Sequence, residues 1–361
     1  LEFEKARAYE ARIGWTYNSV AVGNRLYGAG YFLGGPGFMT NRHGHQSSYP
    51  QMVRSINISL DYWSQEIKEK EISLFLMGSK EMAVAAKMHN LPFRFLTSSR
   101  YKNYFFWSPN EYYENPKLES AFNAVDHLEG HDMDAPMVAN MQSRDRFLQE
   151  RANFRNLIWD VGYITLQQIY WRLRGYEKAK THSLMERLRV RIQRWIDWHK
   201  VLQKSVRLAT LVDKPFVFYP LHIEPEVALQ RVSPEYFYQH ALIAAVSRDL
   251  PAGYLLAIKE PLNGIGMRPR GFYDQVLALK NVVMIDPRDL GIDTVRQARV
   301  TITIAGSAGV EAAAMGKPVI TFGKHNNYNL LDHVSIVRDE LQLKDYLRDA
   351  LFGEFNYEKA R

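Results

Sequence analysis

The stretch Thr301–Gly323, TITIAGSAGVEAAAMGKPVITFG, combines two strand-like segments with a run of very small residues. Its apolar start is typical of a buried strand, and Ala-Gly-Ser-Ala-Gly, an alanine-rich helix and a second apolar strand follow. Small residues at the carboxyl end of a strand let backbone N–H groups approach a ligand, and a helix N-terminus attracts anions. The stretch therefore predicts a strand–turn–helix–strand unit with a phosphate site at the turn.

The turn and the start of the helix supply the candidate nucleotide-binding residues. We assign the phosphate contacts to Gly306, Ser307, Ala308 and Gly309. We place Glu311 in the first helical turn, where its carboxylate would accept hydrogen bonds from ribose hydroxyls. The alternative is a tight turn in which Glu311 only favours the helix dipole.

The chain around this unit alternates strands with helices from Lys214 onward. Apolar runs at 215–221, 254–260 and 281–286 are predicted strands, and the intervening segments have helical patterns, the first of them capped by Ser233. This alternation predicts an α/β fold with a doubly wound parallel sheet, whose ligands bind outside the carboxyl ends of the strands.

Two further strand ends carry polar residues. In FYPLHIEPEVALQ, His222 can donate to a phosphate, and Glu226 can orient it or bind a sugar hydroxyl. In AIKEPLNGIGMRPRGFY, the candidates for neutralising a phosphate or a leaving group are Lys259, Glu260 and Arg268. The alternatives are a polar surface loop and an ordinary ion-paired loop. We expect no metal, because one His and two Glu at this spacing form a poor zinc site.

These three motifs, in this order, resemble the capsule-polysaccharide-biosynthesis glycosyltransferases of bacteria, a family that includes Kdo transferases. The resemblance covers roughly 214–323 and implies a GT-B-like fold, in which two Rossmann-like domains face a cleft. It implies that Ser307, Gly309 and Glu311 hold a nucleotide-activated sugar, which can be a CMP-linked keto-sugar, with His222 near it. Relatives commonly have Lys-Glu-His-Pro where this chain has Lys259-Glu260-Pro261, so the histidine associated with the leaving group is missing.

The predicted layout has four parts. Residues 1–116 form an acceptor-side α/β domain, with a strand over 72–78 and a following helix capped by Ser79. Residues 117–210 form a helical insertion, 211–337 the nucleotide-sugar domain, and 338–361 a helix that packs back toward the first domain. In the first part, His43 and His45 lie in a Gly-rich loop and are candidate general bases. The aromatic segment 97–116 could stack on sugar rings, with Arg100, Glu111 and Glu114 as partners.

Length, composition and net charge limit the kinds of partner that the chain can bind. The chain has 361 residues, no cysteine and a net charge of +7, so it suits two domains and an anionic partner. Much of that charge lies on a predicted amphipathic helix, 184–200. Its basic side is either a solvated face or a contact to a membrane surface or an acidic glycan. Nucleic acid is disfavoured because no nucleic-acid motif accompanies the charge. We expect a cytoplasmic protein, in contact with the inner membrane face if the helix binds lipid.

The sequence thus predicts a metal-independent GT-B-like glycosyltransferase that transfers a sugar from a nucleotide donor to a hydroxyl of a surface-polysaccharide or glycolipid acceptor. Two alternatives remain. One is a non-hydrolysing sugar-nucleotide epimerase of the same fold. The other is a non-catalytic nucleotide-sugar-binding subunit of a polysaccharide assembly complex, which the missing histidine favours.

Overall fold

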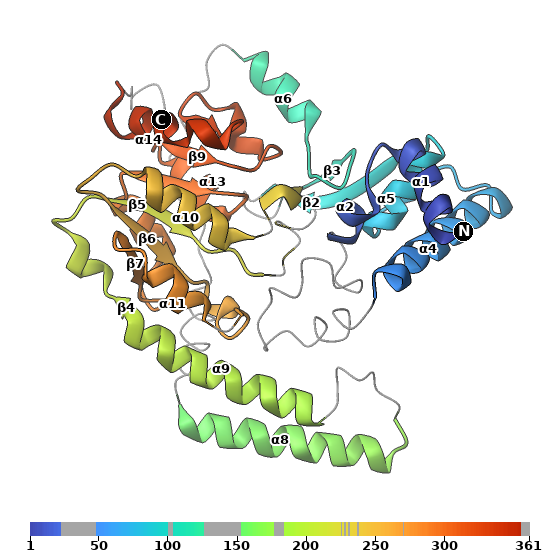
Figure 1. Ribbon diagram of the computed structural model, residues 1–361, viewed down its shortest axis with the longest axis horizontal. Coiled ribbons are helices and arrows are strands. Elements are labelled where there is room, and N and C mark those ends of the chain that lie inside the picture. Colours follow the sequence, from blue (N-terminus) through green and yellow to red (C-terminus); the bar gives the residue numbers. More distant parts are fainter. Residues whose placement is uncertain are drawn as a thin grey trace.

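The computed structural model confirms the predicted α/β class and contains two sheets. A three-stranded sheet lies in the N-terminal domain and a seven-stranded sheet in the C-terminal domain, with a long helical hairpin extending from the latter (Figure 1). The residues described are 1–22, 48–99, 104–125, 153–176, 184–224, 226, 229, 232–236, 238–269 and 271–354.

The N-terminal sheet pairs β1 with β2 in parallel and β2 with β3 antiparallel. The strands are β1 (Phe75–Leu76), β2 (Phe93–Ser98) and β3 (Phe105–Ser108). The helices packed with them are α1 (Glu2–Ile13), α2 (Tyr17–Val22), α4 (Tyr49–Glu69) and α5 (Lys80–Met88). The strand predicted over 72–78 is only two residues long, because Met77 and Gly78 have φ angles of 65° and 140° that end it. Ser79 caps α5 as predicted, accepting from the N–H of Met82 at 3.3 Å.

The C-terminal sheet is parallel throughout, and its central strands β5, β8 and β9 are buried on both faces, as is usual in parallel sheets. Its strands are β4 (Ser205–Val206), β5 (Phe216–Pro220), β6 (Leu255–Lys259), β7 (Val282–Ile285), β8 (Val300–Thr303), β9 (Val319–Thr321) and β10 (Val334–Ile336). Along β5, Val217 and Tyr219 pack into one core and Phe216 and Phe218 into the other. The predicted doubly wound sheet is therefore confirmed.

Helices cover both faces of this sheet. They are α10 (Gln239–Asp249), α11 (Phe272–Leu277), α12 (Gly291–Gln297), α13 (Ser307–Ala314) and α14 (Leu343–Phe352). Residues of α10, α11 and α14 belong to one core, and residues of α12 and α13 to the other. The single-turn segment η6 (Pro234–Tyr236) precedes α10.

The strand order β10-β9-β8-β5-β6-β7-β4 contains a reversal. From β5 the chain proceeds outward through β6 and β7, and then returns to place β8 on the other side of β5, followed by β9 and β10. The topological switch point therefore lies between β5 and β8, where the two loops leaving the sheet diverge and leave a crevice in doubly wound folds.

Three local predictions are wrong. Ser233 does not cap a helix, because η6 intervenes and α10 begins only at Gln239. Glu311 lies in the second turn of α13, since the helix begins at Ser307. The last helix does not pack toward the N-terminal domain: α14 contributes Leu343 and Leu347 to the core of the C-terminal domain.

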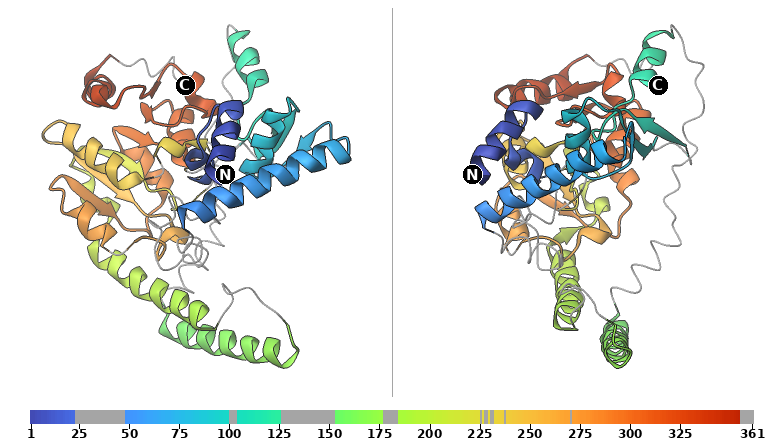
Figure 2. Two further views of the ribbon diagram at one scale, coloured as in Figure 1. Left: turned by 45° about the vertical axis from the view of Figure 1, so that its right-hand side comes forward. Right: turned by 90° about the vertical axis from the view of Figure 1, so that its right-hand side faces the viewer.

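The segment between the two sheets contains α6 (Pro116–Asn123), α8 (Phe154–Leu173) and α9 (Leu184–Lys204). The C-terminal half of α9 is anchored, because Trp198 and Val201 are buried in the core of the C-terminal domain. Helix α8 lies along α9, and the pair forms a hairpin that extends away from both sheets (Figure 2).

We predict that Gly309→Ala destabilises the protein by about 1–3 kcal/mol, because there is no space for a methyl group. A Cβ at Gly309 would lie 2.6 Å from the Tyr328 hydroxyl and 2.7 Å from Cγ2 of Thr303. The matched control is Gly291→Ala in α12, where a Cβ meets nothing within 4 Å. Chemical denaturation should leave the control within about 0.5 kcal/mol of wild type or slightly more stable. Equal effects of the two substitutions would contradict the packing seen around α13.

Candidate functional site

The structure brings the three predicted motifs together around His222, two of them at the switch point between β5 and β8 and the third beneath it. His222 follows β5, and the turn Ile304–Gly306 follows β8. Nε2 of His222 accepts from the N–H of Ala305 at 3.4 Å and lies 3.4 Å from Oγ1 of Thr303. Because the backbone N–H can only donate, the neutral ring carries its proton on Nδ1. That nitrogen lies 3.9 Å from a carboxylate oxygen of Glu226.

The N-terminus of α13 lies beside this imidazole. Its N-cap residue is Gly306, which has no side chain to cap the helix, and its own N–H donates to Oγ1 of Thr303 at 3.1 Å. Within the described part of the chain, the N–H groups of Ser307 and Ala308 donate to no acceptor. Unsatisfied N–H groups at a helix start, with the dipole behind them, favour an anion.

The four residues assigned to the phosphate differ in where they lie. Ser307 is exposed and Gly306 is partly exposed, whereas Ala308 and Gly309 are buried. Gly309 lies against Tyr328 and Thr303, so it allows α13 to pack closely on its neighbours. A Cβ on Gly306 would lie 3.2 Å from Cε1 of His222, so this glycine allows the turn to approach the imidazole.

Glu311 lies one turn further along α13 and is half-buried. Burial raises the pKa of Glu311 above its usual range, and burial is the sole cause of the shift. A half-buried carboxylate without a compensating charge can gain from hydroxyl donors, which is the role that the sequence suggested.

A buried polar network beneath the site holds His222 by its backbone. The side chain of Gln239 accepts from the N–H of His222 at 2.7 Å and donates to its carbonyl oxygen at 2.9 Å. Glu224 accepts from the backbone N–H and the side-chain amide of Gln239 at 3.1 and 2.7 Å. Sequence analysis missed Gln239 because it placed this residue inside a helix starting at Pro234.

Arg268 is the centre of this network. It donates to Glu260 through Nε and Nη2, each at 2.9 Å, to the carbonyl oxygen of His222 at 2.5 Å, and lies 3.3 Å from Glu224. Tyr273 also donates to Glu260, at 2.8 Å. Burial opposes the charge of Arg268, but the two carboxylates outweigh burial and raise the pKa of its guanidinium.

This pairing changes the interpretation of the third motif. Arg268 and Glu260 are 3% and 0% exposed, so in this arrangement both lie below the ligand-facing surface. Their charges compensate one another, and Arg268 serves to position the loop after β5. Lys259 donates to the carbonyl oxygen of Pro287 at 3.1 Å, which ties the end of β6 to the loop after β7.

The N-terminal domain contacts the C-terminal domain through the predicted aromatic segment. Glu114 accepts from Nδ1 of His325 at 2.7 Å, and the ring of Tyr112 stacks on that imidazole with centroids 4.6 Å apart. Glu111 is buried 3.5 Å from the ammonium of Lys80, at the start of α5. His325 follows β9, so this contact lies next to the carboxyl edge of the large sheet.

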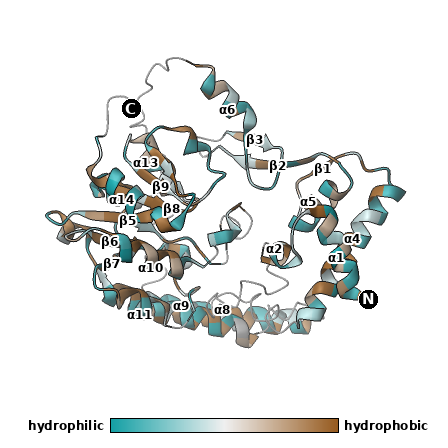
Figure 3. Ribbon diagram, turned by 45° about the horizontal axis from the view of Figure 1, so that its top comes forward, coloured by the Kyte–Doolittle hydropathy of each residue, from teal (hydrophilic) through white to brown (hydrophobic). Residues whose placement is uncertain are grey.

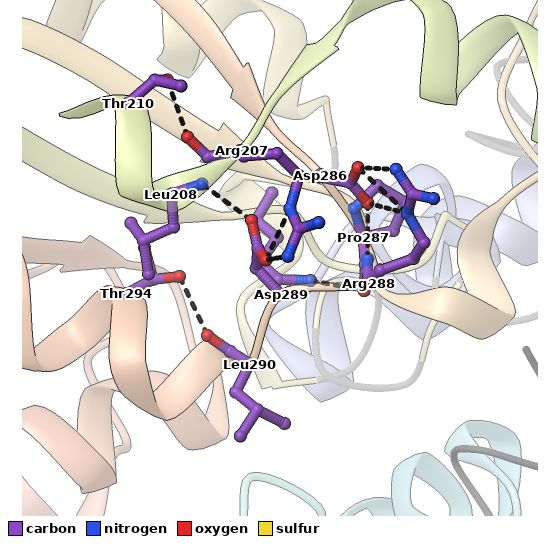
Figure 4. Close-up of polar contacts among 10 residues, drawn as sticks. Arg207, Leu208, Thr210, Asp286, Pro287, Arg288, Asp289, Leu290 and Thr294 are labelled. Carbon is purple, nitrogen blue, oxygen red and sulfur yellow. Dashed lines mark hydrogen bonds and ion pairs between the residues drawn. The ribbon is translucent and has the colours of Figure 1, made fainter.

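A further polar cluster, which sequence analysis did not single out, lies at the carboxyl ends of β4 and β7 (Figure 4). Arg207 donates to Asp289 at 2.6 and 2.9 Å, and Arg288 binds Asp286. An open hollow of about 350 Å³ lies beside it, lined by Leu208, Ala209, Val212, Asp289, Leu290, Asp293, Arg296 and Gln297. Because Asp289 also accepts from the N–H of Leu208 at 2.7 Å, its carboxylate is used in joining the two strand ends.

Several predicted residues lie outside the described part of the chain. They are His43, His45 and Arg100. The same holds for Asp132 and Asp134, an Asp-x-Asp pattern that the expectation of a metal-independent reaction passed over. Among the described residues, no three His, Asp or Glu side chains are grouped as metal ligands.

No family model matches the chain, and no curated protein matches it. Among solved structures it is similar to the β-Kdo 2,7-transferase and β-Kdo 2,4-transferase of KpsC from Thermosulfurimonas dismutans, each at 13% identity. The first match covers 84% of this chain and 80% of the other with a TM-score of 0.39, and the second 77% and 78% with 0.37. A Listeria monocytogenes protein described as a UDP-N-acetylglucosamine 2-epimerase is 12% identical, covering 87% and 73% with a TM-score of 0.33.

We predict that Arg268→Met destabilises the protein by about 3–5 kcal/mol, because it leaves two buried carboxylates without their cation. The matched control is Arg296→Met, which removes an arginine that is 57% exposed and pairs with Asp293 three residues away. Its effect should stay below about 1 kcal/mol. Urea denaturation measures both, and a loss for Arg268→Met no larger than for the control would overturn the positioning role of Arg268.

We predict that Glu311→Gln raises the melting temperature at neutral pH. The pKa of Glu311 is raised in the folded state, so its charge destabilises the fold once pH exceeds the folded pKa, whereas well below its unfolded pKa both states are protonated. The gain should therefore shrink as pH falls toward about 4. Melting curves across this range, with exposed Glu119→Gln in α6 as the control, check the prediction. A gain that grows on acidification, or that the control shares, would contradict it.

Proposed function

We propose that the C-terminal domain binds a nucleotide-activated sugar at the switch point between β5 and β8, and that the protein transfers the sugar to a hydroxyl acceptor. The observation that carries the proposal is the convergence there of the imidazole of His222 with the uncapped start of α13. Doubly wound sheets bind their ligands at this point, and a helix start favours phosphate.

Each residue of the site has a separate role in the proposal. The N–H groups of Ser307 and Ala308 bind a phosphate of the donor, and Nδ1 of His222 donates to the same group. Glu311 accepts from the ribose hydroxyls, which would offset part of the cost of its burial. These contacts are compatible with any nucleobase, and a CMP-linked sugar is one of the donors to be tested.

In the proposed reaction, the acceptor oxygen forms a bond to the anomeric carbon while the bond from that carbon to the phosphate oxygen breaks. The acceptor proton passes to a base, for which His43 and His45 remain candidates. The leaving phosphate gains negative charge, so the helix start and the imidazole bind it more tightly as the bond breaks.

The acceptor would approach from the N-terminal domain. Tyr104, Phe105 and Trp107 of the β3 region are 61%, 63% and 50% exposed, and such rings can stack on sugars. The contact of Tyr112 and Glu114 with His325 joins this region to the carboxyl edge of the large sheet. The two halves of the proposed site are therefore connected by residues of both domains.

The first test is a thermal-shift and calorimetric panel of CMP, CDP, UMP, UDP and GDP. At least one nucleotide should raise the melting temperature of the wild type, because a ligand of the native state stabilises it. Ser307→Glu places a carboxylate at the phosphate position, and Glu311→Ala removes the acceptor for the ribose. Each should weaken binding by about tenfold or more, Ser307→Glu through repulsion between its carboxylate and the phosphate, and Glu311→Ala through the loss of a hydrogen bond to a charged group.

The matched control is Ser55→Glu, which adds the same charge at an exposed serine of α4. It should bind the nucleotide as the wild type does. Absence of any shift, or a shift that Ser307→Glu leaves unchanged, would exclude the donor site. Once the nucleotide is known, products from its sugar derivatives separate the remaining alternatives. An epimerase changes the sugar without an acceptor, and a non-catalytic subunit returns it intact.

A further inference from the structure

Helix α8 is apolar on all sides, although only one side of it is packed. The side facing α9 contains Leu157, Ile164 and Trp171. The opposite side carries large hydrophobic side chains that are at least half or nearly half exposed: Ile158, Trp159, Tyr163, Leu166, Ile169, Tyr170 and Leu173. A helix that is apolar all round is normally buried on all sides, so the outer face of α8 lacks a partner within the described part of the chain.

The inner face of α8 packs against α9. Asp160 pairs with Arg191 at 2.5 Å, and Gln167 accepts from Arg187 at 2.7 Å. The guanidinium of Arg187 also lies over the ring of Trp171, 5.1 Å from its centroid. These contacts fix the rotation of α8, so the outer residues cannot turn inward. Figure 3 shows hydrophobic residues recurring along the hairpin.

The outer face is highly exposed along the whole length of α8. Trp159 is 75% exposed, Leu166 69% and Leu173 82%. In both orientations of Figure 2 the hairpin extends from the rest of the molecule, so a flat partner can reach it without meeting the two sheets.

The hairpin is strongly basic. Residues 153–176 and 184–204 contain nine Lys and Arg against three Asp and Glu, which accounts for most of the chain's net charge of +7. Three of the arginines, Arg155, Arg172 and Arg174, are exposed on or beside α8 itself. The apolar face is therefore bordered by positive charge, and its partner should be both apolar and anionic.

We propose that the outer face of α8 docks on an anionic lipid bilayer surface. Aromatic and aliphatic side chains enter the interface between headgroups and acyl chains, and the arginines bind the lipid phosphates. A second copy of the hairpin fits less well, because face-to-face pairing would bring two basic surfaces together. The described helices include none long and apolar enough to cross a membrane, so the contact is one in which α8 lies on the surface.

This surface differs from the one that the sequence suggested. The basic helix 184–200 was the expected contact, but Arg187 and Arg191 are engaged with α8. The structure assigns the apolar contact to α8 and leaves the exposed arginines of both helices to the lipid headgroups.

The test is co-sedimentation of the full chain with vesicles, without nucleotide. One set of vesicles contains phosphatidylcholine alone, and the other an equimolar mixture of phosphatidylcholine and phosphatidylglycerol. The wild type should bind the mixed vesicles and bind the neutral ones much more weakly. Ile158→Glu with Leu166→Glu should weaken binding to the mixed vesicles by at least about tenfold, since two apolar side chains no longer enter the interface.

The matched control is Ile58→Glu with Leu341→Glu, which adds the same charge at side chains 56% and 83% exposed on other surfaces. Ile158 and Leu166 are 58% and 69% exposed, so neither pair should disturb folding, and circular dichroism checks this. The control should bind vesicles nearly as well as the wild type. No binding of the wild type, or an equal loss in both variants, would overturn the proposal. Self-association that only the hairpin variant abolishes would assign the face to a second copy instead.

Discussion

The candidate site depends on one buried cation, the guanidinium of Arg268, held between Glu224 and Glu260. Removing three charged groups from water costs several kcal/mol for each ion, and only close pairing with additional hydrogen bonds recovers that cost. The loops after β5 and β6 can therefore occupy few positions relative to one another, because any displacement would leave a buried charge without its partner. Tyr273 and the carbonyl oxygen of His222 complete the set of hydrogen bonds around these groups.

The buried network around Arg268 also fixes the position of His222 at the surface of the site. Arg268 and Gln239 hold the carbonyl oxygen of His222, so the imidazole is directed at the turn after β8. There the ring accepts from Ala305, and Gly306 is small enough to approach it. At the switch point, His222 is thus held by the buried electrostatic network, and the turn facing it is held by the close packing of α13. Groups preorganised in this way can act on a ligand without first reorganising.

The sequence predicted the strands of the large sheet more accurately than it predicted which groups the charged residue Arg268 contacts. Runs such as Phe216–Pro220 and Val282–Ile285 are apolar because they are buried on both faces, so their pattern alone identifies them. The convergence of motifs at strand ends follows from the parallel topology. The sequence placed Arg268 at a phosphate, whereas in the structure it pairs with Glu260. The charge partner of an arginine depends on tertiary contacts, which the local sequence does not contain. The N-terminal sheet was overestimated for a local reason, the positive φ of Met77.

The charged groups beneath the site have a structural role, which differs from the role proposed for the groups at its surface. Beneath the surface, Arg268 is matched by carboxylates, and that arrangement favours a single conformation. At the surface, Glu311 is desolvated with no opposing charge among the causes of its pKa shift, and the helix start beside it has no side-chain cap. Both features reduce the stability of the free protein, and both are relieved by a ligand that carries hydroxyl donors and a phosphate. Proteins keep such unfavourable groups where activity requires them, which supports the proposed donor site at this surface.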